Sequence, residues 1–389
     1  MLIKVQNLPK KFRIKEKFCY IQFTKLLLIF FLLAYFISLK KQFKKTRIKN
    51  EKNENINKNI NKSININSNI DINSNISNYV NIAVNFDNKY IYPFITFLTS
   101  LLDNRADSTF YIVHILTGYN FKNNTSLKIK SVIDKFGKNY CNVSFYNLGF
   151  QFMRATSGKY ISTASYYRIS LPSLLPNVDK IIYIDTDVIN FKDLSLMYNI
   201  ELDNDTYFCG PLDFANMKDE LRDFHIFPEK YINSGISLMN LKAMRNNDIE
   251  NQLRKFVSSH FLKHHDQTAI NVLCLNNTQI LPYKFAFFAL FNSTDQLIKY
   301  NNEQNEKYKY NETELIQAFY NPVSLHYAGW TKPWQKEYQL TNSAYWWYYA
   351  KKSGFYQEIL NNYGFKNEEV ENILKKTPDN GKLIKYNFD

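Results

Sequence analysis

From Tyr79 onward the chain alternates short apolar runs with segments of helical spacing. Strands are expected at Val80–Phe86, Phe110–Leu116 and Asn142–Asn147, with helices at Pro93–Leu102 and Lys128–Phe136 between them. This alternation is typical of an α/β domain in which crossover helices join the strands of a mainly parallel sheet. We therefore predict a doubly wound α/β domain whose ligand site lies at the carboxyl ends of its strands.

An apolar segment comes before this domain. Phe18–Leu39 has 22 residues interrupted by one charge, Lys25, and about 20 apolar residues are enough to cross a bilayer. A membrane anchor is therefore expected, and a cleaved signal peptide is the alternative. Lys40 and Lys41 follow where a small-residue cleavage site would be needed, which favours the anchor. Because Lys and Arg flank both ends, the orientation in the membrane is not predicted.

The positive charge of the chain is concentrated around this apolar segment. The net charge is +14, and residues 1–50 contribute +12 of it, because they hold 13 Lys and Arg against one acidic residue, Glu16. The other 339 residues carry +2. A basic flank of this kind is typical of a membrane boundary, so we expect a membrane partner and no nucleic-acid partner.

The four cysteines are scattered and contain no Cys-x-x-Cys pair. Such a pattern does not make a disulfide framework. Cys141, Cys209 and Cys274, which fall in the α/β domain, are therefore expected to be buried free thiols.

Composition divides the chain into five segments. They are a basic arm (1–17), the transmembrane anchor (18–39), a basic and then Asn-rich flexible linker (40–78), the α/β domain (79–340) and an aromatic and basic helical region (341–389). In the last segment, the aromatic and lysine side chains of Tyr345–Lys352 suit either a membrane interface or a packed helix. Residues 302–316 are rich in Asn, Glu, Lys and Tyr and are expected to form a surface insertion.

Two carboxylates end an apolar run at Lys180–Asp187. On a strand, residues i and i+2 project to the same side, so Asp185 and Asp187 are placed to hold a hard divalent cation that neutralises a diphosphate. The alternative is that one aspartate caps a turn and the other is solvated. The preceding buried strand favours the cation, because an ionised aspartate there is costly without a partner.

Five further polar segments occur in order along the chain. They are Asn81–Tyr90, Ser165–Pro172, Tyr231–Leu241, His265–Asn271 and His326–Trp334. With Lys180–Asp187 between them, they resemble glycosyltransferase family 8, the bacterial lipopolysaccharide galactosyl- and glucosyltransferase type, from about Asn81 to Phe355. The resemblance implies the GT-A fold for the domain at 79–340, a UDP-sugar donor, Mn²⁺, and retention of the anomeric configuration.

The resemblance assigns the nucleotide and the cation to particular residues. Asp87 and Tyr90 match a turn that binds uracil, although Lys89 stands where the family usually has Asn; a plain Asp-Asn turn remains the alternative. His326 would be the third cation ligand beside the two aspartates. Imidazole with two carboxylates suits Mn²⁺ better than Mg²⁺, which is kept as the alternative.

The same resemblance assigns the sugar and the diphosphate. Donor contacts are implied for Arg168, Thr186, Asn233, Ser234, Gly235, Gly329 and Lys332. For Arg168 a surface ion pair is the alternative, and Asn-Ser-Gly alone is simply a turn. Asp266 would bind sugar hydroxyls, or cap a helix, and Gln267 would sit beneath the anomeric carbon. Lys332 would stabilise the departing UDP, so the catalytic set is Gln267, Asp266 and Lys332.

These residues predict transfer of galactose or glucose from UDP to a glycan or lipid-linked saccharide. Because Gln267 is a poor nucleophile, same-face attack is favoured over a covalent intermediate, and Asp213 is a candidate for orienting the acceptor hydroxyl. An inactive sugar-binding or scaffold protein is the alternative. A sugar nucleotidyltransferase is disfavoured, because Val80–Tyr90 contains no glycine. The resemblance to bacterial members favours the bacterial inner membrane, with the catalytic domain on the cytoplasmic side because UDP-sugars are cytosolic there. In a eukaryote the same layout would be that of a type II Golgi protein.

Overall fold

A computed structural model describes residues 76–375, with gaps at 120, 123, 153–154, 156–162, 215–220, 222–223, 225–229 and 305–308. The expected basic arm, the apolar segment at 18–39 and the linker up to residue 75 lie outside the described residues. Within the described part of the chain, no helix is long and apolar enough to cross a membrane.

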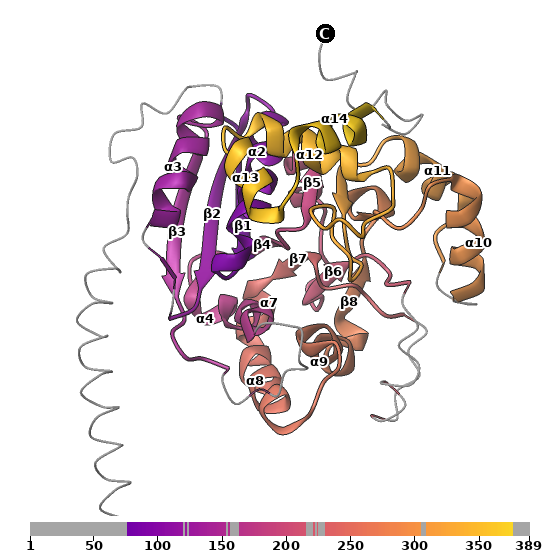
Figure 1. The fold of residues 1–389 in the computed structure, drawn as a ribbon. Coiled ribbons are helices and arrows are strands. Elements are labelled where there is room, and N and C mark those ends of the chain that lie inside the picture. Colours follow the sequence, from indigo (N-terminus) through magenta and orange to yellow (C-terminus); the bar gives the residue numbers. More distant parts are fainter. Residues whose placement is uncertain are drawn as a thin grey trace, which may run out of the picture. The chain divides into compact units, whose positions relative to one another are not determined.

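Seven of the described strands form one sheet in the order β3-β2-β1-β4-β7-β6-β8 (Figure 1). Their bounds are β1 Asn78–Asn85, β2 Thr109–Thr117, β3 Cys141–Asn147, β4 Lys180–Ile184, β6 Phe208–Gly210, β7 Ile236–Asn240 and β8 Thr278–Ile280. Among them β7 runs antiparallel to both of its neighbours, and the other pairs are parallel. The predicted α/β class with a mainly parallel sheet is confirmed.

Helices cover both faces of this sheet. On one face α2 (Ile91–Asp103) and α3 (Asn124–Phe136) pack against the buried side chains of β1 and β2. On the other face, side chains of β4 and β7 pack with α7 (Leu241–Asn246), α8 (Ile249–Ser259) and α9 (His265–Leu273). A sheet buried on both faces requires nearly continuous apolar strands, which is why the strand runs were recognisable in the sequence.

A smaller sheet has the order β5-β10-β9. It contains β5 (Val188–Asn190), β9 (Phe287–Phe288) and β10 (Ser324–His326). β10 pairs antiparallel with β5, in a register that places His326 opposite Val188. The backbone N–H of Tyr327 then donates to the carbonyl of Asp187 at 2.9 Å. This pairing joins the end of β4 to a segment far along the chain.

The other elements in the described residues have at most 11 residues each. They are η1 Asn88–Tyr90, η2 Thr163–Ser170, α4 Leu171–Leu174, α5 Ser195–Tyr198, η3 Leu275–Asn277, η4 Tyr283–Phe285, α10 Thr294–Gln304, α11 Glu312–Tyr320, α12 Ser343–Lys352, α13 Tyr356–Tyr363 and α14 Asn367–Lys375.

The aromatic side chains of α12 belong to the core. Trp346 and Trp347 are fully buried, and Tyr345 is nearly so. The hydroxyl of Tyr349 accepts a hydrogen bond from Nδ2 of Asn104, the residue that follows α2, at 2.7 Å. Of the two interpretations of this segment, the packed helix is therefore confirmed. The membrane-interface interpretation is wrong for these aromatic side chains, because they face the protein interior.

The predicted surface insertion at 302–316 is wrong in part. Tyr310 and Leu315 are buried in the core around the smaller sheet. The hydroxyl of Tyr310 donates to the carbonyl of Leu281 and accepts from the N–H of Leu212, each at 2.9 Å. The polar composition of the segment gave no sign of these buried side chains, of which Tyr310 lies just before α11 and Leu315 lies within it.

Cys141, Cys209 and Cys274 are buried and free, as expected. Burial raises the pKa of each thiol to about 12, because a thiolate is poorly solvated in an apolar interior. These three residues therefore act as small apolar side chains.

Candidate functional site

Three potential cation ligands converge where β4 meets the smaller sheet. Asp185 and Asp187 follow the last residue of β4, and His326 is the last residue of β10. Each offers one ligand atom, and these atoms all lie within 4.8 Å of one another. Asp187 and His326 are buried, as is Thr186 between the two aspartates. Two carboxylates and an imidazole form a ligand set that fits a divalent transition metal.

Gly235 leaves the space between these ligands open. Its carbonyl accepts from the N–H of Asp185 at 2.7 Å, which brings the two backbones together. A Cβ at this position would lie 2.4 Å from Cε1 of His326 and 2.8 Å from Oδ2 of Asp185. Both distances are too short for a side chain, so the arrangement requires glycine.

Lys332 also contacts this group. Its ammonium lies 2.6 Å from Oδ2 of Asp187 and donates to the carbonyl of Tyr327 at 2.7 Å. Nε2 of His326 lies 3.4 Å from the other oxygen of Asp187. Burial by itself would raise the pKa of the Asp187 carboxyl, but Lys332 and His326 together outweigh burial and lower it. Asp187 is therefore ionised at neutral pH and available to a cation.

Arg168 is buried and contacts several polar groups of the site. It is 3 % exposed. Its Nε lies 3.0 Å from Oδ2 of Asp266, and its Nη2 lies 3.2 Å from Oδ1 of Asp185. Nη1 donates to the carbonyl of Ser234, and the guanidinium lies 3.6 Å from the centre of the Tyr183 ring. One arginine thus links η2, β4, the turn before β7 and α9, and the surface ion-pair alternative is wrong.

Asp266 is held from two sides. Besides Arg168, the hydroxyl of Ser234 donates to its Oδ2 at 3.1 Å. Burial raises the pKa of Asp266 to about 6, and the nearby Asp185 adds to this effect, while Arg168 opposes it. Asp266 lies inside the first turn of α9, whose N-cap residue is His264, so the helix-capping alternative is not what the structure shows.

Asp213, Asn233 and Gln267 form a polar cluster beside the cation-ligand group of Asp185, Asp187 and His326. Oδ2 of Asp213 accepts from Nδ2 of Asn233 at 2.9 Å and from Nε2 of Gln267 at 2.8 Å. Oε1 of Gln267 accepts from the N–H of Ser234 at 3.1 Å. The isolated bridge between Leu212 and Ile232 places the segments that carry Asp213 and Asn233 side by side.

The predicted uracil-binding turn lies near the acidic group. Asp87 accepts from the N–H of Lys89 at 2.8 Å and so begins η1. Tyr90 is 38 % exposed, and its ring packs edge-on against Trp334. Burial of part of this side chain raises the pKa of its hydroxyl to about 12, helped by the charges of Asp187, Asp87 and Asp185. Part of the Tyr90 side chain is therefore accessible beside this turn.

Gly329 lines a cleft of about 220 Å³, which is also bordered by Leu290, Tyr327 and Tyr338. A Cβ on Gly329 would meet only Leu290 and Thr331, at 3.4 and 4.0 Å.

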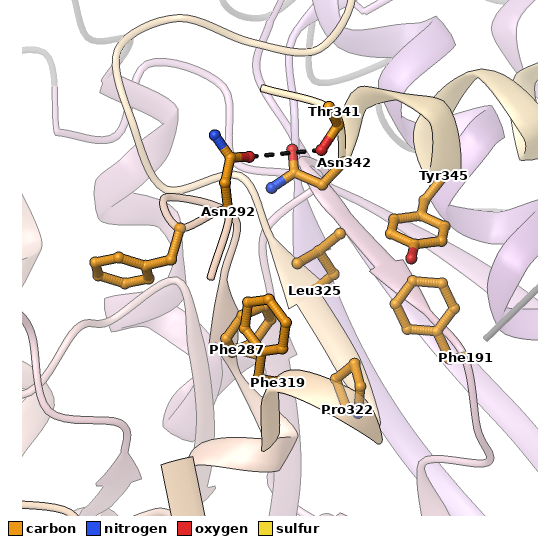
Figure 2. A pocket seen from close by; sticks show the side chains of 10 residues that line it. Phe191, Phe287, Asn292, Phe319, Pro322, Leu325, Thr341, Asn342 and Tyr345 are labelled. Carbon is orange, nitrogen blue, oxygen red and sulfur yellow. Dashed lines mark hydrogen bonds between the residues drawn. The ribbon is translucent and has the colours of Figure 1, made fainter. Parts of the chain in front are cut away.

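Figure 2 shows a different, apolar pocket. Its walls include Phe287, Phe319 and Leu325, and the hydroxyl of Thr341 donates to Asn292 at one rim. That pocket contains none of the residues predicted for the site.

Tyr183 is a site residue that sequence reasoning missed. It is fully buried, and its hydroxyl donates to Oδ1 of Asp185 at 2.8 Å and also contacts Oδ1 of Asn85. A signal was present, because Tyr183 precedes Asp185 by two residues and therefore points to the same face of the strand. In a strand this apolar, nothing else in the local sequence distinguishes this tyrosine from an ordinary core residue.

The model of the glycosyl transferase family 8 matches residues 81–338. General stress protein A of Bacillus subtilis is 28% identical over 189 residues, which cover 46% of this chain and 62% of that protein. The lipopolysaccharide 1,2-glucosyltransferase of Escherichia coli K12 is 25% identical over 265 residues, 66% of this chain and 73% of that protein. The solved structure of the galactosyltransferase LgtC, in complex with donor and acceptor sugar analogues, superposes with a TM-score of 0.57 at 20% identity, covering 70% of this chain and 96% of that one.

Proposed function

Because this chain belongs to glycosyl transferase family 8, we propose that it transfers a hexose from a UDP-sugar to a hydroxyl of a glycan or lipopolysaccharide-type acceptor. The proposed transfer depends on a divalent cation, Mn²⁺ in preference to Mg²⁺, and retains the anomeric configuration. Galactose and glucose both remain candidates for the sugar, since the choice rests on the orientation of one hydroxyl and the polar groups that meet it.

One observation carries the proposal. The ligand group of Asp185, Asp187 and His326 lies next to the polar cluster of Asp213 and Gln267, and Arg168, bonded to both Asp185 and Ser234, connects the two. A cation site suits a diphosphate, and paired donors and acceptors suit sugar hydroxyls. A cation site next to a polar cluster therefore suits a nucleotide-sugar, whose diphosphate would meet the first and whose sugar would meet the second.

In this proposal Asp185, Asp187 and His326 hold the cation. When bound, the cation supplies positive charge that offsets the negative charge of the diphosphate as UDP departs. Lys332 adds a second positive charge at the same place, after exchanging its contact with Asp187 for one with the diphosphate. Gly329 lets the backbone approach the diphosphate, and Tyr90 and Asp87 meet the uracil.

The sugar lies over the polar cluster. Asn233 and Asp266 meet its hydroxyls, and Arg168, whose nitrogens are already engaged with protein groups, keeps Asp266 in place. Gln267 is a poor nucleophile because it is a neutral amide, and its two ends are occupied by Ser234 and Asp213. We therefore favour attack on the same face from which UDP leaves, with Asp213 orienting the acceptor hydroxyl.

The cellular setting is also a proposal. The apolar segment at 18–39 would anchor the chain, and residues 40–78 would let the domain reach an acceptor at the membrane. Bacterial UDP-sugars are cytosolic, so the catalytic domain would face the cytoplasm at the inner membrane.

UDP release tests the function. The full-length chain in detergent is given UDP-galactose or UDP-glucose, with and without Mn²⁺, beside an Asp187→Ala variant. Mn²⁺-dependent release that the variant lacks is expected, and the faster donor identifies the sugar. A folded protein that binds neither Mn²⁺ nor UDP would instead support the inactive, sugar-binding alternative.

A further inference from the structure

We propose that Tyr183 is a positioning residue that divides the two carboxylate oxygens of Asp185 between the protein and a bound divalent cation. Oδ1 is held by protein donors, and Oδ2 is thereby presented to the cation. This inference rests on the proposed function, because it concerns the same cation site.

The first observation is that, of the two carboxylate oxygens of Asp185, Tyr183 contacts Oδ1 only. Its hydroxyl donates to Oδ1 of Asp185 at 2.8 Å. The tyrosine is fully buried in β4, and its backbone pairs with β1 on one side and β7 on the other. A fully buried side chain on a backbone paired on both sides has little freedom to follow the carboxylate if it rotates, so the hydrogen bond favours one carboxylate orientation.

The second observation is that Arg168 selects the same oxygen. Its Nη2 lies 3.2 Å from Oδ1 of Asp185. The guanidinium is stacked on the ring of Tyr183, 3.6 Å from the ring centre, so the tyrosine also supports the arginine. A single aromatic side chain thus acts on Oδ1 twice, directly through its hydroxyl and indirectly through the arginine that rests on it.

The third observation concerns the other oxygen. Oδ2 of Asp185 lies close against Gly235, where a Cβ would be 2.8 Å from this oxygen and 3.0 Å from Nε2 of His326. Oδ2 therefore lies on the same side of the carboxylate as the imidazole, the other nearby cation ligand. Without donors on Oδ1, the carboxylate would turn freely, because the last torsion of aspartate is broad and two-fold.

If Oδ1 of Asp185 is held in this way, a Tyr183→Phe variant should bind Mn²⁺ more weakly than the wild type. The variant keeps the ring under Arg168 and loses the hydroxyl. Removal of an outer partner of a metal ligand lowers metal affinity about 10- to 100-fold, and we expect the lower end of this range because Arg168 still holds Oδ1. The Mn²⁺ concentration that half-saturates transfer should rise by about the same factor, while kcat at saturating Mn²⁺ changes far less.

Tyr111→Phe is a matched control. Tyr111 is fully buried on β2 of the same sheet, and its hydroxyl donates to a carboxylate, Oδ2 of Asp193, at 2.9 Å. This variant loses the same kind of buried hydrogen bond at a place that the candidate site does not include. A purely structural role for Tyr183 would make the two variants alike in Mn²⁺ affinity.

The experiment is a titration of the full-length protein with Mn²⁺, with free Mn²⁺ followed by electron paramagnetic resonance. Weaker binding by Tyr183→Phe, with wild-type binding by Tyr111→Phe, supports the inference. Equal affinity of Tyr183→Phe and wild type, or an equal loss in both variants, overturns it. Should Tyr183→Phe not fold, Arg168→Lys removes the forked donor from Oδ1 and must also weaken Mn²⁺ binding. If the wild-type protein binds no Mn²⁺ even with UDP, the proposed function itself fails.

Discussion

The ammonium of Lys332 lies 2.6 Å from Oδ2 of Asp187. A cation that binds Asp187 must therefore displace this lysine or share the carboxylate with it. The same displacement would free the lysine for a diphosphate. The contact thus couples the cation site to the part of the site that is proposed to hold the leaving group.

A Lys332→Ala variant should separate the two roles. Without nucleotide, we expect Mn²⁺ to bind at least as tightly as in the wild type, because a competing positive charge has been removed. Sugar transfer should fall about 10²-fold, the usual effect of losing one group that stabilises developing charge. Mn²⁺ titration and UDP-release kinetics on one preparation check both effects. Loss of Mn²⁺ affinity would show that the lysine supports the cation ligands instead.

Gly235→Ala should abolish Mn²⁺ binding without unfolding the protein. The new methyl group would lie 2.4 Å from Cε1 of His326 and 2.8 Å from Oδ2 of Asp185, so these two ligands must move apart. The Gly329→Ala variant is the control for metal binding, since its methyl group would approach only Leu290 and Thr331, at 3.4 and 4.0 Å. Mn²⁺ titration and circular dichroism measure the two properties. Wild-type Mn²⁺ affinity in Gly235→Ala would contradict the proposed ligand set.

His114 should make the stability depend on pH. Burial lowers its pKa from 6.5 to about 4; its ring lies 3.1 Å from both the Asn81 side-chain oxygen and the Tyr146 hydroxyl. In the unfolded chain His114 is protonated below about pH 6.5, whereas in the folded protein it is protonated only below about pH 4. The contribution of His114 to the free energy of unfolding therefore falls by roughly 3 kcal/mol as pH drops through this window; the raised pKa of Asp266 contributes in the opposite direction.

A His114→Gln variant should lack this contribution, so its free energy of unfolding should fall less between pH 7 and pH 4.5 than that of the wild type, whatever its stability at pH 7. Urea unfolding at pH 7 and at pH 4.5 measures the difference for each protein. His260→Gln, at an exposed position, serves as the control and should keep the wild-type slope. If His114→Gln keeps it too, another group is responsible for the pH dependence.

Trp346→Ala should destabilise the protein strongly. The side chain is fully buried among Trp334, Trp347 and Tyr363, and truncation of a buried tryptophan costs about 3–5 kcal/mol. Trp330→Ala removes a tryptophan that is 75 % exposed and should change the free energy of unfolding little. Urea unfolding of both variants compares them. A small effect of Trp346→Ala would mean that α12 does not belong to the core.

Local patterns in the sequence determined the main sheet and its class. The strands at 80–86, 110–116 and 142–147, and the helices between them, were predicted within a few residues of their observed bounds. The physical reason is that a strand buried on both faces must be apolar throughout, and its covering helices must be amphipathic. Covalent spacing likewise placed Asp185 and Asp187 together at one strand end.

Side-chain burial in polar or mixed segments was not predictable in the same way. Tyr310 lies in a segment of surface composition and Trp346 beside lysines, yet both are core residues. Local composition shows which residues can be buried, but only the neighbouring elements decide which are. The same holds for Tyr183, whose hydroxyl has a role only because the Asp185 carboxylate and Arg168 meet it there.

The sequence by itself determined the α/β class, the two aspartates at one strand end and, through family resemblance, the identity of the remaining polar motifs. Only the tertiary structure decided how those motifs meet. The antiparallel pairing of β10 with β5 brings His326 to Asp187, and the buried Arg168 joins Asp185 to Asp266. Residues distant along the chain come together through strand pairing and burial, and no local pattern in a single sequence specifies those pairings.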